Sequence, residues 1–412
     1  MTVEIRLAHA SEWVAFNRMI ADVMMAPATA DPEALAEFRR QVFARHRCWV
    51  GANGSQLVAT AATFDAELTM PTAASESHHN VAVDALTVVT VSPTHRRQGI
   101  LRRLMSSQLH DAKRRGALAS ILVAAEYPIY GRFGYGPYCD RVDIALDTRG
   151  LVFRTPGTGH VELVDDLTMR QIAPSIHDAA RRARSGDIDR SSERWDVELQ
   201  INRRPGTEPK RHFNGVCRDD AGNPIGYVRY HLTDDWTDSR RPNATATIVE
   251  LESLSPGASA RLWRFVSEVD WVATVVAEDR PFNDPLRTFL LDGRHVTFTG
   301  LHDFIWLRPL DPQALLAARS YRSADQLVIA VDDPDGLAHD TVEVDGATGR
   351  CERTTKTPDV VCTPGAFGSL VMGGGDAHAL TATGDVRGDD GAVDRLHALL
   401  SWPTPPMCVT HF

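Results

Sequence analysis

The chain has 412 residues and carries 54 acidic against 44 basic side chains, which gives a formal net charge of −10. With 43% hydrophobic and 24% charged residues it has the composition of a globular protein, and its length predicts two to three domains. The negative charge excludes nucleic acid and anionic membranes as expected partners, because both are polyanions, and it favours cationic partners.

The cysteine pattern and the distribution of apolar residues argue against a disulfide-linked, zinc-binding, secreted or membrane-spanning protein. The six cysteines are scattered without a C-x-x-C pair, so we expect neither a disulfide framework nor a zinc site, and no metal cofactor. The N-terminus lacks a basic segment followed by an apolar one, and no run of about 18 apolar residues occurs. We expect a cytoplasmic protein, unless it leaves the cell by a route that needs no signal.

The first seventy residues predict a small mixed α/β region. In some segments apolar residues occur at every second position, as in strands, and in others they recur at helical spacing. An aspartate followed by proline is typical of a helix start, and Asn-Gly is typical of a hairpin turn. The predicted elements are a strand at 3–7, a helix from Ser11, a helix from Asp31-Pro32, hairpin strands 48–51 and 57–61 joined at Asn53-Gly54, and a strand from Phe64 to Met70.

The most informative stretch follows and combines a strand, a basic loop and a helix. β-Branched residues from 86 to 91 predict a buried strand that Pro93 ends. The polar loop 96–99 contains two arginines and a glycine, and apolar residues then recur at helical spacing from Ile100 to about 116. Such a turn directs unpaired backbone N–H groups and the positive end of a helix dipole at one point. The loop 96–99 and the helix start at Ile100 therefore predict a pyrophosphate-binding site, which we call the cradle.

The spacing of this loop is neither that of a dinucleotide-binding fingerprint nor that of a P-loop, which needs a second glycine and a Gly-Lys-Ser/Thr ending. It resembles the R/Q-x-x-G-x-G/A loop with which GNAT-type N-acetyltransferases hold the pyrophosphate of acetyl-CoA. Arg96 and Gly99 match that pattern, whereas Leu101 stands where the pattern has Gly or Ala. Taken alone, Arg-Arg-x-Gly is also typical of an ordinary solvated helix entry.

A second motif follows a predicted buried strand at 119–125. Residues 130–137 read Tyr-Gly-Arg-Phe-Gly-Tyr-Gly-Pro, and they come after Pro-Thr-His-Arg-Arg-x-Gly at 93–99. These two motifs in this order resemble the enhanced intracellular survival (Eis) family of GNAT acetyltransferases, and the resemblance extends over the whole length. It implies an α/β (α+β) fold of two GNAT-like domains followed by a sterol-carrier-protein-like domain.

The resemblance also implies a reaction and its groups. Acetyl transfer from acetyl-CoA to a primary amine needs an acid for the departing thiolate, and the family's acid falls on Tyr130. A tyrosine suits that role because its ordinary pKa is near 10. Tyr127, Tyr135 and Tyr138 lie close in sequence and are the rival candidates.

The family's base is its C-terminal carboxylate, which corresponds here to Phe412. The tail 407–412 is apolar and strand-like, as expected of a buried last strand. A free α-carboxylate has a pKa near 3.5 and is a weak base, so burial and a bridging water would have to assist it. The alternatives are a tail that only docks, with Glu126 or a chain of waters as the base.

Family contacts to the cofactor fall on a strand segment and on the loop that follows it: Val89, Val91, Arg96, Arg97, Gly99 and Ile100. For the amine substrate the candidates are Met24, Phe38 and Glu126. One departure from the family is that Val123 and Ala125 replace a histidine and a serine.

The rest of the chain predicts two further domains. Strands at 161–163, 211–216, 225–230 and 246–251 precede an amphipathic helix at 258–266, and no basic glycine-containing loop stands before that helix. By resemblance this is a GNAT-like domain without a CoA site. From about 320, strands at 327–331 and 342–344 and helices from Thr363-Pro364 and from 390 to 400 resemble a sterol-carrier-protein-like domain.

We therefore expect domains at 1–150, 151–312 and 313–412. The predicted activity is acetylation of primary amines of cationic substrates, such as aminoglycosides, polyamines or lysine side chains. The resemblance implies a homo-hexamer. The rival hypothesis is a lipid or small-molecule carrier whose transferase site is vestigial, because sterol-carrier-like domains hold lipid between sheet and helices.

Overall fold

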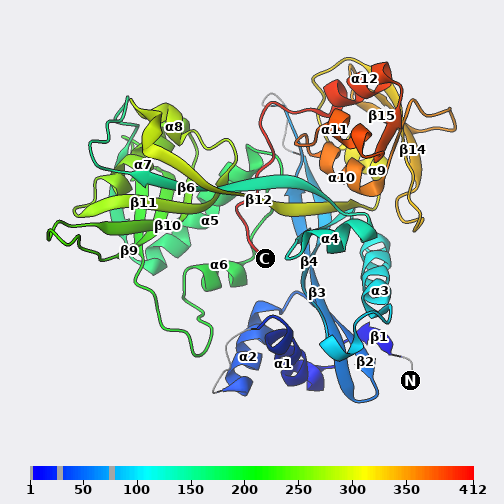
Figure 1. The fold of residues 1–412 in the computed structure, drawn as a ribbon, viewed down its shortest axis with the longest axis horizontal. Coiled ribbons are helices and arrows are strands. Elements are labelled where there is room, and N and C mark those ends of the chain that lie inside the picture. The colour runs from blue at the N-terminus through cyan, green and yellow to red at the C-terminus, as the bar shows by residue number, and fades with distance from the viewer. Residues whose placement is uncertain (1–2, 26–30, 74–78) are drawn as a thin grey trace.

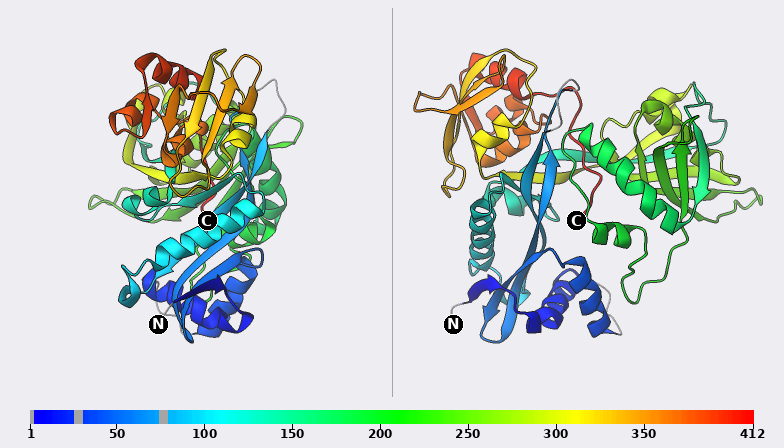
Figure 2. Two further views of the ribbon diagram at one scale, coloured as in Figure 1. Left: turned by 90° about the vertical axis from the view of Figure 1, so that its right-hand side faces the viewer. Right: turned by 180° about the vertical axis from the view of Figure 1, so that it is seen from behind.

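The computed structural model describes residues 3–25, 31–73 and 79–412. We divide it into an N-terminal unit (residues 3–147), a middle unit (160–309), a C-terminal unit (312–400) and a C-terminal tail (401–412). In Figure 1 the three units form three lobes, and the red tail descends from the C-terminal unit and ends between the other two. The reverse view in Figure 2 shows the same central position for the C-terminus.

One sheet of twelve strands runs through the N-terminal and middle units, in the order β1-β2-β3-β4-β5-β12-β6-β11-β10-β9-β8-β7. Its strands are β1 (Glu4–Leu7), β2 (Arg47–Asn53), β3 (Gln56–Thr69), β4 (Asn80–Val91), β5 (Ala119–Val123), β6 (Gly136–Asp147), β7 (His160–Val164), β8 (Phe213–Arg218), β9 (Pro224–Thr233), β10 (Ala244–Ser253), β11 (Val272–Pro281) and β12 (Val296–Pro309).

The two units exchange strands at the middle of this sheet. β12 of the middle unit pairs antiparallel with β5 of the N-terminal unit, with Ile305 opposite Val123 and Pro309 opposite Ala119. β6 of the N-terminal unit lies between β12 and β11 of the middle unit. Figure 1 shows β6 and β12 crossing together from one lobe to the other. The two units therefore share one continuous hydrogen-bonded sheet.

One helix of the N-terminal unit begins at a side-chain cap that the sequence predicts. α2 (Pro32–Val42) has Asp31 as its N-cap, whose carboxylate accepts a hydrogen bond from the backbone N–H of Ala34 at 2.8 Å. α1 (Trp13–Val23) follows a short 3₁₀ turn, and α3 (Ile100–Arg114) follows Gly99. Leu104, Met105 and Leu109 of α3 are buried against the sheet.

The middle unit contains α5 (Asp166–Arg182), α6 (Ser192–Glu198), α7 (Pro256–Ser267) and α8 (Leu286–Phe289). The C-terminal unit has a five-stranded sheet, in the order β15-β14-β13-β16-β17, with four helices. Its elements are α9 (Pro312–Ala317), β13 (Gln326–Val331), β14 (Asp340–Asp345), β15 (Arg350–Arg353), β16 (Val360–Cys362), α10 (Pro364–Val371), α11 (Ala377–Ala382), β17 (Val386–Gly388) and α12 (Asp390–Leu400).

Most predicted elements are confirmed, and two details are corrected. Asn53 pairs with Gln56 within the hairpin, so the turn residues are Gly54 and Ser55, with Gly54 at φ +61°. The tail is not a strand, because residues 401–412 form no ladder with any described strand. Among the described residues, no helix has the length and apolarity needed to cross a membrane.

Candidate active site

β4 separates from its neighbour β5 at the point where the predicted cradle begins. The two strands run parallel only as far as Leu86, which pairs with Leu122. Val88 then adopts φ +47°, and the register with β3 shifts there between Thr60 and Ala62. A β-bulge of this kind bends the strand, and on its other side β4 has no described pairing with β5 beyond Leu86. The segment 87–91 therefore presents open backbone groups on the side that faces away from β3.

The loop after β4 has the conformation that an anion site requires. Gly99 lies in the left-handed region at φ +72° and forms the N-cap of α3, with no atom within 4 Å of the place where a Cβ would stand. Arg96 and Arg97 are exposed beside it. The first turn of this 15-residue helix thus directs its free N–H groups and two guanidinium groups at one region.

A cavity of about 630 Å³ lies against this loop, and we call it the cradle cavity. All six residues predicted to contact the cofactor line it: Val89, Val91, Arg96, Arg97, Gly99 and Ile100. Tyr130 and Glu126 line its other side. The structure therefore brings the strand edge, the basic loop and the candidate acid to one cavity.

Tyr130 differs from its three neighbouring tyrosines in where its hydroxyl lies. It ends the short helix α4 (Tyr127–Tyr130) and its side chain is buried, yet its hydroxyl has no hydrogen-bond partner among the described residues. Burial, with a smaller effect from the Glu126 carboxylate, raises the pKa of Tyr130 to about 12. The phenol is therefore protonated at neutral pH and has a proton to give.

The other three tyrosines have structural contacts. The Tyr135 hydroxyl is buried between Ser120 Oγ at 2.8 Å and Gln108 Nε2 at 3.3 Å. The Tyr138 hydroxyl donates to the carbonyl of Gly186 at 2.9 Å. Tyr127 is exposed and packs its ring edge-on against Trp306. None of these three lines the cradle cavity in the described part of the chain.

A second cavity, of about 250 Å³, lies on the other side of the bulge, and we call it the tail cavity. Thr87 and Val88 line it, whereas Val89 to Val91 line the cradle cavity, so the bulge of β4 is a wall common to both. Its lining also includes Phe43, His46, Phe64, Asp189 and the C-terminal residue Phe412. Met24 and Phe38 line neither cavity.

Aromatic rings form a continuous wall of the tail cavity. The rings of Phe43 and His46 have centroids 4.6 Å apart, those of His46 and Phe64 are 4.7 Å apart, and that of Phe412 meets Phe64 edge-on at 5.5 Å. Burial lowers the pKa of His46 to about 4, so the imidazole is neutral at pH 7. The ring of the last residue is thus one side of the cavity.

The charged groups around the tail cavity are largely matched. Arg190 pairs with Glu250 at 2.7 Å, and Arg45 lies 3.8 Å from Glu193. Asp189 accepts a hydrogen bond from the backbone N–H of Glu67 at 2.7 Å, and burial raises its pKa. Because each of these arginines already has a carboxylate partner, they do not by themselves repel a cationic amine.

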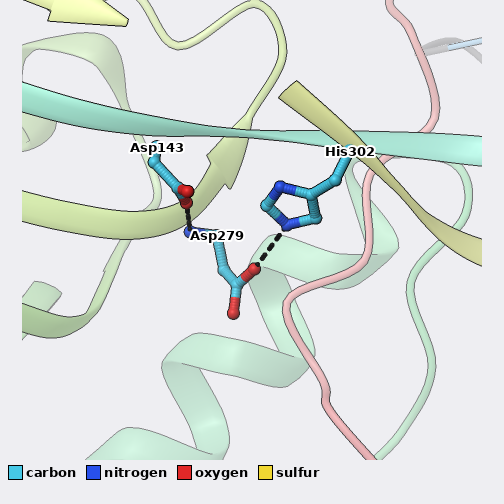
Figure 3. Close-up of side chains that lie close together, drawn as sticks. All are labelled: Asp143, Asp279 and His302. Atoms are coloured by element: carbon cyan, nitrogen blue, oxygen red, sulfur yellow. Dashed lines mark hydrogen bonds and ion pairs between the residues drawn. The ribbon is translucent and has the colours of Figure 1, made fainter. Parts of the chain in front are cut away.

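A cluster of ligand-type side chains lies on the shared strands β6, β11 and β12. Oxygen and nitrogen atoms of Asp143, Asp279 and His302 lie within 4.8 Å of one another. Figure 3 shows that these groups are bonded among themselves: His302 Nε2 contacts Asp279 at 3.0 Å, and Asp143 accepts from the backbone N–H of Asp279 at 3.1 Å. Arg141 also pairs with Asp279 at 3.2 Å. These contacts account for the cluster, and we assign no ion to it.

Among the described residues that line the tail cavity, sequence reasoning named only Phe412 as a site residue, and it did not identify those outside β4 and the tail. They come from the end of α2, from β3 and from residues 189–194 before and within α6, which are distant in sequence. The acidic and basic side chains in 189–194 carry no local motif, and the two helices α5 and α6 were themselves not predicted. Only the folding of the middle unit against the N-terminal unit brings these segments together.

Comparison with known proteins assigns the three units. Residues 4–138 and 186–309 each match a model described as an acetyltransferase (GNAT) domain, and residues 312–409 match a sterol carrier protein domain. The fold is therefore two GNAT domains followed by a sterol-carrier-protein-like domain.

Relatives match along most of the chain. An uncharacterized N-acetyltransferase of Streptomyces avermitilis is 36% identical over 373 residues, which is 87% of each chain. The N-acetyltransferase Eis of Mycobacterium tuberculosis is 28% identical over 370 residues, again 87% of each chain. The crystal structure of Eis1 from Mycobacterium abscessus has a TM-score of 0.85 at 28% identity and covers 99% of this chain and 100% of that one. The chain belongs to the Eis-like family of GNAT N-acetyltransferases.

Proposed function

We propose that this protein transfers the acetyl group of acetyl-CoA to a primary amine of a cationic substrate, with Tyr130 as general acid and the Phe412 carboxylate as general base. GNAT acetyltransferases use acetyl-CoA, and the family assignment makes the chain an acetyltransferase. The amine and the roles of individual residues are the proposed part.

The reaction requires two proton transfers. The amine nitrogen attacks the thioester carbonyl, a C–N bond forms, and the C–S bond breaks as the tetrahedral intermediate collapses. The Tyr130 hydroxyl gives its proton to the departing sulfur, and the Phe412 carboxylate, directly or through a water, takes the proton that the nitrogen loses. The pyrophosphate of acetyl-CoA would be held by Arg96, Arg97 and the N-terminus of α3.

The single observation that carries the proposal is the place of Tyr130. Among the described residues, it is the one tyrosine of its cluster that lines the cavity with all six predicted cofactor residues. The hydroxyls of Tyr135 and Tyr138 are hydrogen-bonded elsewhere. Phe412 lines the adjoining cavity across the bulge of β4. The carrier alternative has less support, because the buried side chains of Phe367, Leu370 and Leu396 fill the space between sheet and helices of the C-terminal unit.

The activity is tested by the release of free CoA thiol on mixing the protein with acetyl-CoA and a panel of amines. The panel contains aminoglycosides, which are the class that the family resemblance implies, together with polyamines and lysine peptides. Turnover with any of these supports the transferase, whereas fatty-acid binding without turnover would support the carrier.

The terminal base is tested by adding a few residues after Phe412. The extension moves the carboxylate away and places a peptide at the tail cavity, so turnover is expected to be lost while acetyl-CoA binding persists. The same residues added to the N-terminus are the control and are expected to leave turnover unchanged. Normal turnover of the C-terminally extended protein would return the role of base to Glu126 or to water.

A further inference from the structure

The C-terminal tail leaves the C-terminal unit after Trp402, whose N–H donates to the carbonyl of Gly373, and from Met407 onward its described hydrogen bonds to other segments go to the N-terminal and middle units. Its residue Met407 donates a backbone hydrogen bond to the carbonyl of Ser185 at 2.9 Å. It passes so close to Gly186, at φ +94°, that a Cβ there would lie 2.9 Å from Pro406. Further along, the N–H of Val409 donates to Asp187 at 3.3 Å.

A buried arginine of the shared sheet holds the middle of the tail. Arg141 on β6 has a side chain that is 3% exposed, and it donates through Nε at 3.0 Å and through Nη2 at 2.5 Å to the carbonyl of Cys408. Its charge is matched by Asp279, which the contacts with Asp143 and His302 orient, as Figure 3 shows. The cluster thus positions the counter-ion of an arginine that binds the tail.

A second buried arginine holds the tail two residues from its end. Arg190 is also 3% exposed, and it donates to the carbonyl of Val409 at 3.1 Å and to the Thr410 hydroxyl at 2.9 Å. Its carboxylate partner is Glu250 on β10, and its guanidinium lies 4.8 Å from the centroid of the Trp195 ring. Charge-assisted hydrogen bonds of this kind are about twice as strong as neutral ones.

From these contacts we infer that the middle GNAT domain binds the C-terminal tail. Arg141 and Arg190 are positioning residues that keep Phe412 at the tail cavity. The inference rests on the proposed function for its catalytic consequence. A terminal segment without a strand ladder frays unless it is tied down. The carboxylates that hold the two arginines, Asp279 and Glu250, both lie on strands of the middle unit.

Arg190→Met tests this inference, and Arg280→Met is a closely matched control. Arg280 is likewise a buried arginine of the middle unit, pairs with one carboxylate (Asp284), lies near a tryptophan ring (Trp263) and donates to a backbone carbonyl (Leu251). It makes no hydrogen bond to the tail within the described residues. The measurements are deuterium uptake of the C-terminal peptide, kcat and KM for acetyl-CoA, on the full chain.

We expect Arg190→Met to speed deuterium uptake at the Met407 and Val409 amides at least tenfold and to lower kcat at least tenfold, with KM for acetyl-CoA unchanged. The control Arg280→Met is expected to lower Tm while leaving uptake and kcat unchanged. If Arg190→Met does not fold, Arg190→Met combined with Glu250→Leu removes both buried charges together.

The outcomes separate this inference from the proposed base. Unchanged deuterium uptake in Arg190→Met would overturn the inference, and so would a loss of kcat while the tail amides stay protected. Faster deuterium uptake with normal kcat would support binding of the tail by these arginines and would overturn Phe412 as the base. Faster uptake with reduced kcat supports both.

Discussion

The two GNAT domains use the same strand–helix–strand arrangement, and only one of them has the cradle. β4, α3 and β5 in the N-terminal unit correspond in order and direction to β10, α7 and β11 in the middle unit, and in each case the two strands are parallel. In each case the strands also separate: pairing ends at Leu86 in the first and at Ile248 in the second. A splayed strand pair therefore does not by itself bring a basic glycine-containing loop to the open edge.

The connection to the helix is the first difference. In the N-terminal unit, Gly99 in the left-handed conformation follows two arginines at the start of α3. In the middle unit, Ser255 caps α7 through a hydrogen bond to the N–H of Ala258, and Pro256 occupies the first helical position. A side chain thus satisfies an N–H group that a phosphate would need, and proline supplies no donor.

The open edge of the strand is the second difference. In the middle unit Arg280 enters the gap from β11 and donates to the carbonyl of Leu251 on β10 at 3.0 Å. A hollow of about 490 Å³ remains there, lined by Arg280, Pro256 and Met407 of the tail. In the N-terminal unit the corresponding edge, from Val89 to Val91, faces the cradle cavity. The comparison teaches that the same scaffold leaves an open strand edge beside a basic loop in one copy and fills that edge with an arginine side chain in the other.

The largest expected effect comes from removing the candidate acid. Tyr130→Phe should lower kcat by about 10² to 10⁴, the usual contribution of a general acid, because the proton for the thiolate is lost. Steady-state kinetics with saturating acetyl-CoA measure it. In the control Tyr135→Phe, kcat should persist while stability falls by about 1–3 kcal/mol, because Ser120 and Gln108 lose a buried partner. A reversed ranking of the two variants would reject the role of Tyr130.

The next effect concerns the basic loop that the middle unit lacks. Arg96→Ala and Arg97→Ala should each raise KM for acetyl-CoA about 10- to 10²-fold, because charge-assisted hydrogen bonds to phosphate contribute about 1.5–3 kcal/mol. Arg114→Ala, at the far end of α3, removes an equal charge and should leave KM unchanged. Equal effects of all three variants would mean that only the net charge of the protein matters.

Opening the gap in the middle unit should not create a second cradle. Arg280→Met leaves Asp284 as an unpaired buried charge, so we expect a loss of about 3–5 kcal/mol in the free energy of unfolding. Calorimetric titration with acetyl-CoA should still give one site per chain, because the loop before α7 has neither glycine nor arginine. A second binding event would show that the open edge alone suffices.

The smallest effect separates backbone strain from ligand contact. Gly99→Ala should cost about 1–2 kcal/mol of stability, because an L-residue is disfavoured in the left-handed region, and it should also raise KM for acetyl-CoA by shifting the cradle. Gly54→Ala is the matched control, since Gly54 has φ +61° and equally open surroundings. It should lose similar stability with no change in KM. An unchanged KM in Gly99→Ala would show that the loop tolerates a side chain.

Local patterns predicted much of the fold and one side of the site. The bounds of α2, α10 and α12 follow from Asp31, Thr363 and Asp389 as caps, and the strand, loop and helix around Gly99 were expected from sequence. β11 and β12 were missed, as were α5 and α6. The first half of β12, residues 296–303, pairs only with β6 and is largely exposed to solvent, and this half contains many polar residues. Such a strand lacks the apolar alternation that identifies strands in a sequence.

The sequence by itself determined many of the helices and strands and the basic glycine loop, because caps, turns and apolar periods act over a few neighbours. The tertiary structure decided which of the clustered tyrosines lines the cradle cavity, how β6 and β12 are exchanged, and where the ring of Phe412 lies. Those features depend on contacts between segments far apart in the chain, such as Arg190 with Val409 and Arg141 with Cys408. No local pattern encodes such contacts, since each arginine in the sequence looks like any other surface charge.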